Sequence, residues 1–314
     1  MRKLKISKLA VFFICSIFIF SSIAFAGGTK STGYTQTNYP VMLVHGVSGF
    51  DDLLGFYGYW YKMVEALQDG GASVRAANIS AWNSTEQRGD ALILQIQDFL
   101  KYTGKAKVNL IGHSHGSITC RYAAYKRPDL VASVTTIAGI HKGAQIADFL
   151  LSLPPGVQTV ATGVINLEGT IIDWLTGKPQ DQNSRAAMYS ISTKGVTEFN
   201  AKYPCAGVNG APQETVNGNL IKYYSYTGNS PLTNILDPLE ILFVTMGGIT
   251  SAKGGGANDG AVPVAGAKFG TFIGEYPWNH ADEVNQVLSI RGPFTADPVT
   301  VIRDHVNRLK NAGL

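Results

Sequence analysis

Short apolar runs rich in β-branched residues alternate with segments of helical spacing through the first half of the chain. We interpret these runs as buried strands: Val41–Val44, Ser73–Ile79, Val108–Ile111 and Val131–Ile137. The helical segments between them are Tyr59–Leu67, a stretch that Ser84 can cap and that continues through Phe99, and one that bears Ile118, Tyr122 and Tyr125. This alternation predicts an α/β fold with a mostly parallel central sheet flanked by helices.

The spacing of apolar residues changes after Ala144. Pro154-Pro155-Gly156 precedes a segment whose apolar side chains form one helical stripe: Val157, Val160, Val164, Leu167, Ile171 and Leu175. Packing in the core is the commoner reason for such a stripe. An insertion after this strand, however, lies at the carboxyl edge of the sheet, where α/β proteins bind their ligands. We therefore predict a helical lid insertion over about residues 145–176.

The remainder of the chain has weaker patterns. We expect a late strand at Leu220–Tyr226, a further element at Ile241–Val244, a flexible loop at Gly254–Gly256 and a closing helix at Val299–Lys310. No internal repeat or low-complexity linker interrupts the sequence. Residues 27–314 are therefore expected to form a single α/β domain.

The first 26 residues have the three parts of a secretory signal peptide. Four basic residues precede the apolar run Leu9–Phe20, and Ala24-Phe25-Ala26 supplies a cleavage signal of small residues. A transmembrane helix would need about 20 apolar residues, so this run is too short to be one. We expect cleavage after Ala26 and export through the periplasm to the extracellular space.

The charge balance excludes one class of partner. The sequence has 26 basic and 22 acidic residues, but four of the basic residues lie in the signal peptide, which has no acidic residue. The mature chain therefore has as many acidic as basic residues, and no basic surface for nucleic acid is indicated.

Two cysteines remain in the mature chain, Cys120 and Cys205. Counting alone permits one disulfide between them. Cys120, however, falls in the helix after the third strand, where a buried free cysteine behaves as a small apolar residue. We favour two free thiols.

The pentapeptide Gly112-His113-Ser114-His115-Gly116 stands between a predicted strand and a predicted helix. A G-x-S-x-G sequence occurs by chance in many chains, but this context is that of a nucleophile elbow. A serine at so tight a turn requires glycine on both sides. The start of the helix also offers backbone N–H groups to a developing negative charge. Ser114 is therefore a candidate nucleophile.

A serine hydroxyl needs a base to accept its proton, and histidine is the usual one. The sequence contains six: His45, His113, His115, His141, His280 and His305. Chains with this elbow have the order serine, acid, histidine, which removes His45. His113 and His115 flank the serine and are expected to point away from it.

Of the remaining histidines, His141 follows the next strand with little room for an acid before it. His305 falls on the closing helix, where we expect it to be exposed to solvent. His280 lies in the loop that begins at Tyr276 and is the predicted general base.

Two carboxylates, Asp237 and Asp259, precede His280, and their spacing does not separate them as candidate acids. Asp282 lies too close to His280 to orient its ring. Calcium takes hard oxygen ligands in flexible geometry, and Asp237, Asp282 and the side-chain amide of Gln286 could surround one ion together with a backbone carbonyl. For each acid, a surface carboxylate is the alternative interpretation.

Seven segments between about Tyr34 and the C-terminus are specific when taken together: Val44–Asp51, Val108–Gly116, His141–Gly143, Phe199–Pro204, Ser230–Pro238, Ala257–Gly260 and Asn279–Gln286. With them the chain resembles the secreted bacterial true lipases of the Pseudomonas and Burkholderia type, the family I triacylglycerol lipases. The resemblance implies the α/β-hydrolase fold.

The resemblance also implies individual catalytic roles. Ser114 would be the nucleophile, Asp259 the acid and His280 the base. The backbone N–H groups of Val47 and His115 would form the oxyanion hole. Relatives usually carry methionine where this chain has Val47, but the backbone makes the interaction.

For the metal, the resemblance implies one structural Ca²⁺ that fastens the loop of His280 to a distant strand. Its ligands would be the side chains of Asp237 and Asp282 and the backbone carbonyls of Gln286 and Ile290. Many relatives also have a disulfide that starts near Cys205, whose second cysteine is replaced here at about Ala265.

The implied activity is hydrolysis of long-chain acylglycerol esters at an oil–water interface, through an acyl-enzyme and with a lid that opens there. The enzyme would be a secreted monomer without a nucleic-acid partner, and a lipase-specific foldase is an expected partner during secretion. Two alternatives remain open: a carboxylesterase of short soluble esters, and a non-catalytic lipid-binding protein that keeps the hydrolase fold.

Overall fold

The computed structural model describes residues 33–50, 52–53, 57–177 and 180–314. The expected signal peptide at residues 1–26 lies outside this part of the chain. Thr32–Leu314 form one compact unit. Within the described residues, no helix has the length and apolar character needed to cross a membrane.

A seven-stranded sheet has the order β4-β1-β5-β6-β8-β7, and β9 also pairs with β8. Its strands are β1 (Val41–Val44), β4 (Val74–Ala76), β5 (Val108–His113), β6 (Val131–Ile137), β7 (Gln213–Val216), β8 (Asn219–Gly228) and β9 (Thr271–Tyr276). All neighbouring strands are parallel except β7 and β8. β1, β5 and β6 are buried at every position, which explains their continuous apolar sequences.

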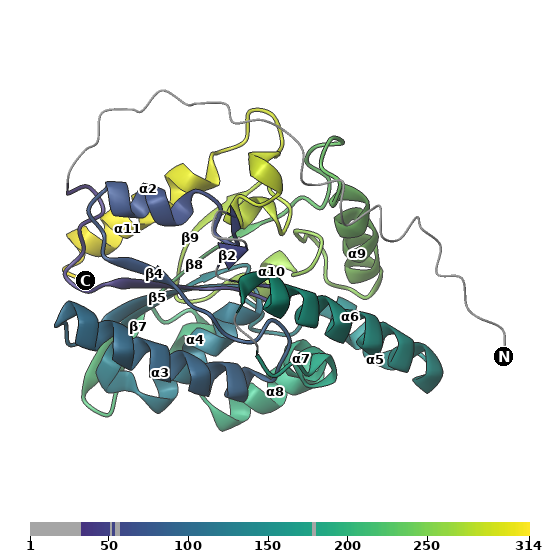
Figure 1. The fold of residues 1–314 in the computed structure, drawn as a ribbon, viewed down its shortest axis with the longest axis horizontal. Helices are drawn as coiled ribbons and strands as arrows, with labels where there is room; N and C mark the ends of the chain where they lie inside the picture. The colour runs from purple at the N-terminus through teal and green to yellow at the C-terminus, as the bar shows by residue number, and fades with distance from the viewer. Residues whose placement is uncertain (1–32, 51, 54–56, 178–179) are drawn as a thin grey trace. The chain divides into compact units, whose positions relative to one another are not determined.

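Helices cover both faces of the sheet (Figure 1). On one face, α3 (Thr85–Thr103) and α4 (His115–Lys126) pack against strand residues such as Met42 and Leu110. On the other face, α2 (Met63–Asp69) and α11 (Pro298–Asn311) pack against Leu43 and Ile111. Successive strand residues point to opposite faces, so each strand contributes to both cores.

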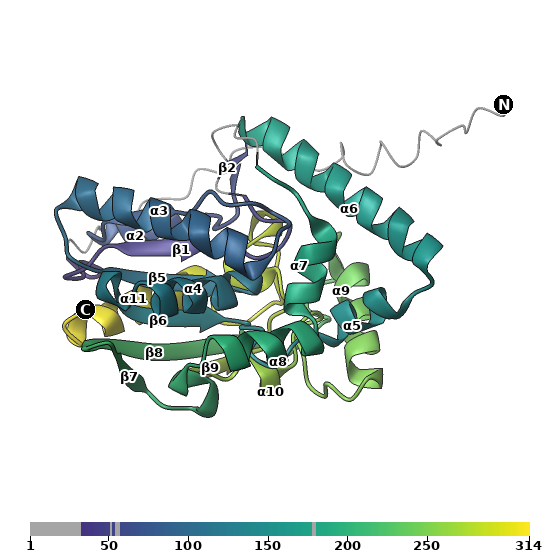
Figure 2. The same ribbon diagram turned by 90° about the horizontal axis from the view of Figure 1, so that it is seen from below.

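Most of the remaining helices gather at the carboxyl ends of the parallel strands (Figure 2). They are α5 (Gln145–Ser152), α6 (Pro155–Thr176), α7 (Ser184–Ile191), α8 (Thr193–Lys202), α9 (Glu240–Ala252) and α10 (Val264–Ala267). A two-stranded ribbon, β2 (Asp52–Leu53) and β3 (Tyr57–Gly58), lies outside the main sheet. Short 3₁₀ turns occupy Pro128–Leu130, Ala206–Asn209, Asp282–Val284 and Val287–Ser289.

The predicted α/β fold with a mostly parallel sheet is confirmed. The helix expected at Tyr59–Leu67 was placed too early, because Lys62 has a φ of 60° and α2 begins only at Met63. Tyr59 therefore lies in a loop. Ile241–Val244 belongs to α9, while β7, β9, α7 and α8 have no counterpart among the predicted elements.

The insertion predicted at about residues 145–176 consists of the helices α5 and α6. Val157 is exposed on α6. The side chains of the other stripe residues, Val160, Val164, Leu167, Ile171 and Leu175, lie outside what the structure describes.

The expectation that His305 is exposed was wrong. His305 is completely buried on α11, and its Nε2 lies 2.7 Å from Thr135 Oγ1 of β6. It continues the buried helical stripe of Ile302, Val306 and Leu309 that packs on the sheet. Burial lowers the pKa of His305 to about 3.

We predict that this burial makes stability sensitive to acid. The unfolded chain protonates His305 near its ordinary pKa of 6.5, whereas the folded chain resists protonation until about pH 3. The stabilisation is complete above pH 6.5 and is lost as the pH falls toward 3, by up to about 1.4 kcal/mol per pH unit. Urea unfolding of the wild type and His305→Gln at pH 7, 5.5 and 4.5 should show a shallower pH slope in the variant. Equal slopes would contradict this assignment.

Candidate active site

Ser114 stands at a strained turn between β5 and α4. Its φ of 54° and ψ of −126° are unfavourable for a residue with a side chain. A Cβ atom on Gly112 would lie 2.4 Å from the carbonyl oxygen of Gly116, and one on Gly116 would lie 2.1 Å from that of Val44. Both positions therefore require glycine, and the turn has the geometry predicted for a nucleophile elbow.

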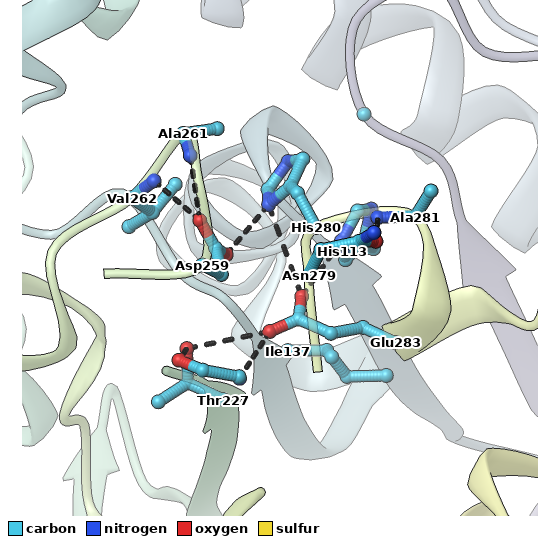
Figure 3. A network of polar contacts seen from close by, with 12 residues as sticks. His113, Ile137, Thr227, Asp259, Ala261, Val262, Asn279, His280, Ala281 and Glu283 are labelled. Atoms are coloured by element: carbon cyan, nitrogen blue, oxygen red, sulfur yellow. Dashed lines mark hydrogen bonds and ion pairs between the residues drawn. The ribbon is translucent and has the colours of Figure 1, made fainter. Parts of the chain in front are cut away.

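His280 and Asp259 form a close pair near the carboxyl ends of the strands (Figure 3). His280 Nδ1 lies 2.7 Å from Asp259 Oδ2, and the His280 N–H donates to the carbonyl of Asp259 at 2.8 Å. A carboxylate at this distance keeps the proton on Nδ1. The Nε2 atom of His280 is thereby left as the acceptor, which is the state a general base requires.

Asp259 is held in a fixed orientation by the loop after α9. Its other oxygen, Oδ1, accepts hydrogen bonds from the N–H groups of Ala261 and Val262 at 2.8 and 2.7 Å. The side chain is fully buried. Of the two acids that sequence spacing left open, the structure thus brings Asp259 to His280, whereas Asp237 lies in a different cluster.

Ser114 is only 3% exposed to solvent, and the side chain of His280 is 13% exposed. Within the described residues, no hydrogen bond joins Ser114 Oγ to His280. Catalytic hydrogen bonds are often long in unliganded enzymes and shorten when substrate binds. Ser114 is thus almost completely covered by the protein.

The loop after β1 passes directly over Ser114. A Cβ atom on Gly46 would lie 2.8 Å from Ser114 Cβ and 3.2 Å from Ser114 Oγ, so only glycine allows this approach. Val47 follows Gly46 in the loop, and His115 is the first residue of α4. The two backbone N–H groups expected to bind an oxyanion therefore belong to segments that meet at the serine.

Arg88 holds this loop from beneath and was not recognised from the sequence. Its guanidinium is fully buried and donates to the carbonyls of His45 at 2.6 Å and Gly46 at 3.3 Å. The peptide group is planar and trans, so fixing the Gly46 carbonyl turns the N–H of Val47 to the opposite side. Burial lowers the pKa of Arg88 to about 9. A lone arginine in an amphipathic helix gives no sequence signal for such a role.

Three other histidines are buried, and each contacts a different group of the protein. His45 Nδ1 contacts the carbonyl of Gly46 at 2.9 Å, and His115 Nε2 lies 2.9 Å from Thr85 Oγ1. The ring of His141 stacks on Phe269, 4.6 Å between centroids. Burial lowers the pKa of each, so all three are neutral at pH 7.

A second cluster of buried acids lies where the loop after β8 meets the loop of His280. It contains Asp237, Glu240 and Asp282, all at most 4% exposed. Asn279 joins them: its Nδ2 lies 3.4 Å from Asp237 Oδ2 and 3.2 Å from Glu240 Oε2, and its N–H donates to Asp282 Oδ2 at 3.2 Å. Glu240 was not among the predicted residues.

The charges in this cluster favour a cation. Burial, together with the neighbouring charges of Asp237 and Glu240, raises the pKa of Asp282 to about 7. Burial and Glu240 also raise the pKa of Asp237. Buried carboxylates at close quarters repel one another unless they are protonated or paired, and several hard oxygen donors suit Ca²⁺. The donors present therefore fit the predicted ion.

The side-chain amide of Gln286, however, does not point toward these acids. Its Nε2 donates to the carbonyls of Gly58 and Tyr59, and its Oε1 accepts from Tyr57 Oη at 2.9 Å. The idea that this amide ligates calcium was therefore wrong, because the amide fastens the 286–290 segment to β3 and Tyr59. The backbone carbonyls of Gln286 and Ile290 stay a prediction.

The two cysteines are free, as predicted. Cys120 is completely buried on α4, where burial raises the pKa of its thiol, and Cys205 is half-buried.

Comparison with known proteins agrees with this geometry. Residues 39–171 match the family described as alpha/beta hydrolase fold. A triacylglycerol lipase of Vibrio cholerae is 42% identical, with 97% of this chain and 99% of that protein covered. One of Burkholderia plantarii is 37% identical, with 90% and 88% covered. Another, from Pseudomonas fragi, is 37% identical, with 89% and 98% covered.

Solved structures support the fold alone. The lipase of Staphylococcus hyicus superimposes with a TM-score of 0.60 at 18% identity, covering 92% of this chain and 99% of that one. A lipase of Bacillus licheniformis in its mature form gives a TM-score of 0.58 at 19% identity, covering 87% and 92%.

Because backbone atoms crowd the elbow, adding one methyl group at Gly116 should lower the stability of the fold. Gly116→Ala should destabilise the fold by about 3 kcal/mol or more, because its Cβ would collide with the backbone of Val44. Gly248→Ala on α9 is the matched control: no atom lies within 4 Å of that Cβ, so stability should change by less than about 1 kcal/mol. Chemical denaturation measures both, and equal stability of the two variants would refute the close packing.

Proposed function

Because the chain belongs to the family of triacylglycerol lipases with the α/β-hydrolase fold, we propose that it hydrolyses long-chain acylglycerol esters through an acyl-enzyme on Ser114. The observation that carries this proposal is the 2.7 Å pair of Asp259 and His280 at the same strand edge as the strained serine. A base with a fixed tautomer at the same edge of the sheet as an elbow serine is what acyl transfer needs.

In this mechanism, His280 Nε2 takes the proton of Ser114 as Oγ attacks the ester carbonyl. Asp259 keeps the imidazole oriented and stabilises its positive charge. The N–H groups of Val47 and His115 bind the negative oxygen of the tetrahedral intermediate. His280 then protonates the departing alcohol and activates a water molecule, which releases the fatty acid.

We propose that α5 and α6 are a lid that moves at an oil–water interface. Two observations support it. Ser114 is nearly inaccessible, and Ile165 and Ile172 of α6 pack with Trp82 in a cluster that also contacts Val47. Substrate access would therefore require displacement of α6. The exposed apolar side chains near α9, Ile235, Leu236, Ile241 and Leu242, suit contact with lipid.

We also propose one structural Ca²⁺, held by the side chains of Asp237 and Asp282 and by the backbone carbonyls of Gln286 and Ile290, with Glu240 adding charge nearby. The ion would neutralise the buried acids and fasten the loop that bears His280, so that it supports the base without entering the chemistry.

The expected signal peptide supports export of the mature enzyme, and we propose that the secreted enzyme is a monomer. A foldase during secretion is part of the same proposal, resting on the resemblance stated for the sequence. Free Cys120 and Cys205 mean that its folding would not depend on a disulfide between them.

Hydrolysis should rise sharply once the substrate forms an interface. We predict that the rate on tributyrin increases several-fold when its concentration passes the solubility limit, because the interface favours the open lid. Ser114→Ala should lose at least about 10³-fold on tributyrin and on soluble p-nitrophenyl butyrate. Wild-type hydrolysis without a rise at the solubility limit would instead favour an esterase of short soluble esters, and activity in Ser114→Ala would exclude the serine mechanism.

Removal of calcium should destabilise the protein more at high pH. Without the ion, the raised pKa of Asp282 lets the folded state keep a proton that the unfolded state releases above about pH 4, so stability falls as the pH rises toward 7. We expect EDTA to lower Tm by about 5 °C or more at pH 8, by less at pH 5, and Ca²⁺ but not Mg²⁺ to restore it.

Asp282→Asn should abolish this response to EDTA. Asp98→Asn, which changes an exposed aspartate paired with Arg75 on the surface, should retain it. A wild-type Tm that does not respond to EDTA at either pH would rule out the ion.

A further inference from the structure

Tyr59 and His113 form a buried hydrogen-bonded chain beside the serine. The Gly46 N–H donates to Tyr59 Oη at 3.2 Å, Tyr59 Oη lies 2.6 Å from His113 Nδ1, and His113 Nε2 lies 3.0 Å from Glu283 Oε2. Tyr59, His113 and Glu283 are all at most 8% exposed. None of these side chains has a role in the mechanism above.

The direction of the hydrogen bonds follows from the protonation states. Burial raises the pKa of the Tyr59 hydroxyl and lowers the pKa of His113, so the phenol keeps its proton and the imidazole is neutral. Because Tyr59 accepts from Gly46, its own proton is donated to His113 Nδ1. A neutral imidazole has one donor and one acceptor, so Nε2–H donates to Glu283.

The chain joins the three loops that carry the catalytic groups. Gly46 precedes Val47 in the loop after β1, His113 ends β5 next to Ser114, and Glu283 follows His280 by three residues. Glu283 is itself anchored, since its Oε1 accepts from the Gly228 N–H. Thr227 Oγ1 lies 3.5 Å from the same oxygen (Figure 3).

The end of this hydrogen-bonded chain formed by His113 and Glu283 lies close to the base His280. The ring centroids of His113 and His280 are 4.4 Å apart. A ring nitrogen of each histidine and a carboxylate oxygen of Glu283 lie within 4.8 Å of one another. Glu283 Oε2 remains 3.9 Å from His280 Nδ1, farther than Asp259 at 2.7 Å. A shift of this hydrogen-bonded chain would therefore move the base His280 and the loop of Gly46 and Val47 relative to Ser114.

We propose that Tyr59 and His113 are positioning residues for ester hydrolysis, which hold the oxyanion donor of Val47 and the base His280 at fixed separations from Ser114. This inference rests on the proposed function. Its consequence is specific: breaking the chain weakens binding of the transition state and leaves binding of the ground-state ester nearly unchanged.

Tyr59→Phe removes the hydroxyl and keeps the packing of the ring, so it tests the hydroxyl alone. The ring contacts Trp60, Phe50 and His45, with centroids 5.7–6.0 Å apart, and phenylalanine keeps these contacts. Tyr122→Phe is the matched control, because Tyr122 is also buried but its hydroxyl bonds to Asp90 on α3.

With soluble p-nitrophenyl butyrate, Tyr59→Phe should lower kcat by about 10-fold, less than the 10²–10³-fold typical of losing an oxyanion donor itself. KM should stay within about twofold. Affinity for a trifluoromethyl ketone, which mimics the tetrahedral intermediate, should fall by the same factor as kcat. Tyr122→Phe should match the wild type in all three. A Tyr59→Phe enzyme with wild-type kcat and inhibitor affinity, or one that differs only in KM, would overturn the proposal.

Two further measurements complete the test. His113→Gln, whose amide can still donate to Glu283, should show no additional loss in combination with Tyr59→Phe, because both break the same link; additive losses would count against the chain. In the wild type, ¹⁵N NMR should find neutral His113 with its proton on Nε2. A ring proton of His113 that lacks the downfield shift of a hydrogen-bonded imidazole would overturn the proposal even if the variants fail to fold. Activity in Ser114→Ala would instead refute the proposed function.

Discussion

The site depends on one steric constraint, the crowding of backbone around Ser114. Gly116 lies against the carbonyl of Val44, Gly112 against that of Gly116, and Gly46 against the serine side chain. These contacts hold a residue with a positive φ at the junction of β5 and α4. The strain costs stability of order 1–3 kcal/mol, and it presents the hydroxyl at the N-terminus of a helix and against the loop after β1.

Parallel strands bring distant loops to one edge, and buried polar groups then fix those loops. Arg88 holds the carbonyls of the loop after β1, Asp259 holds His280, and the hydrogen-bonded chain from Tyr59 to Glu283 lies between them. Such groups are expensive to bury unless every partner is satisfied, so they tolerate few alternative arrangements. The positions around Ser114 are thus fixed by polar contacts beyond those of the Asp259–His280 pair, while the apolar cores on both faces of the sheet supply stability.

The sequence predicted those parts that local pattern determines. β6 has the predicted bounds and the elbow was recognised, because apolar runs and paired glycines act within a few residues. Contacts between segments that are distant in the sequence could not be predicted in this way. Spacing could not choose between Asp259 and Asp237, the burial of His305 depends on how α11 packs, and Tyr59 was assigned to a helix. The roles of Arg88 and Glu240 follow only from their contacts with residues that are distant in the sequence.

If Ser114 is a nucleophile activated by His280, the folded protein should react with a fluorophosphonate at this one residue. Peptide mass spectrometry of the reacted protein should find one phosphonyl group per molecule, on the peptide that contains Ser114. Labelling should be at least about 10²-fold slower in His280→Ala. Labelling at another residue, no labelling of an active preparation, or an unchanged rate in His280→Ala would contradict it.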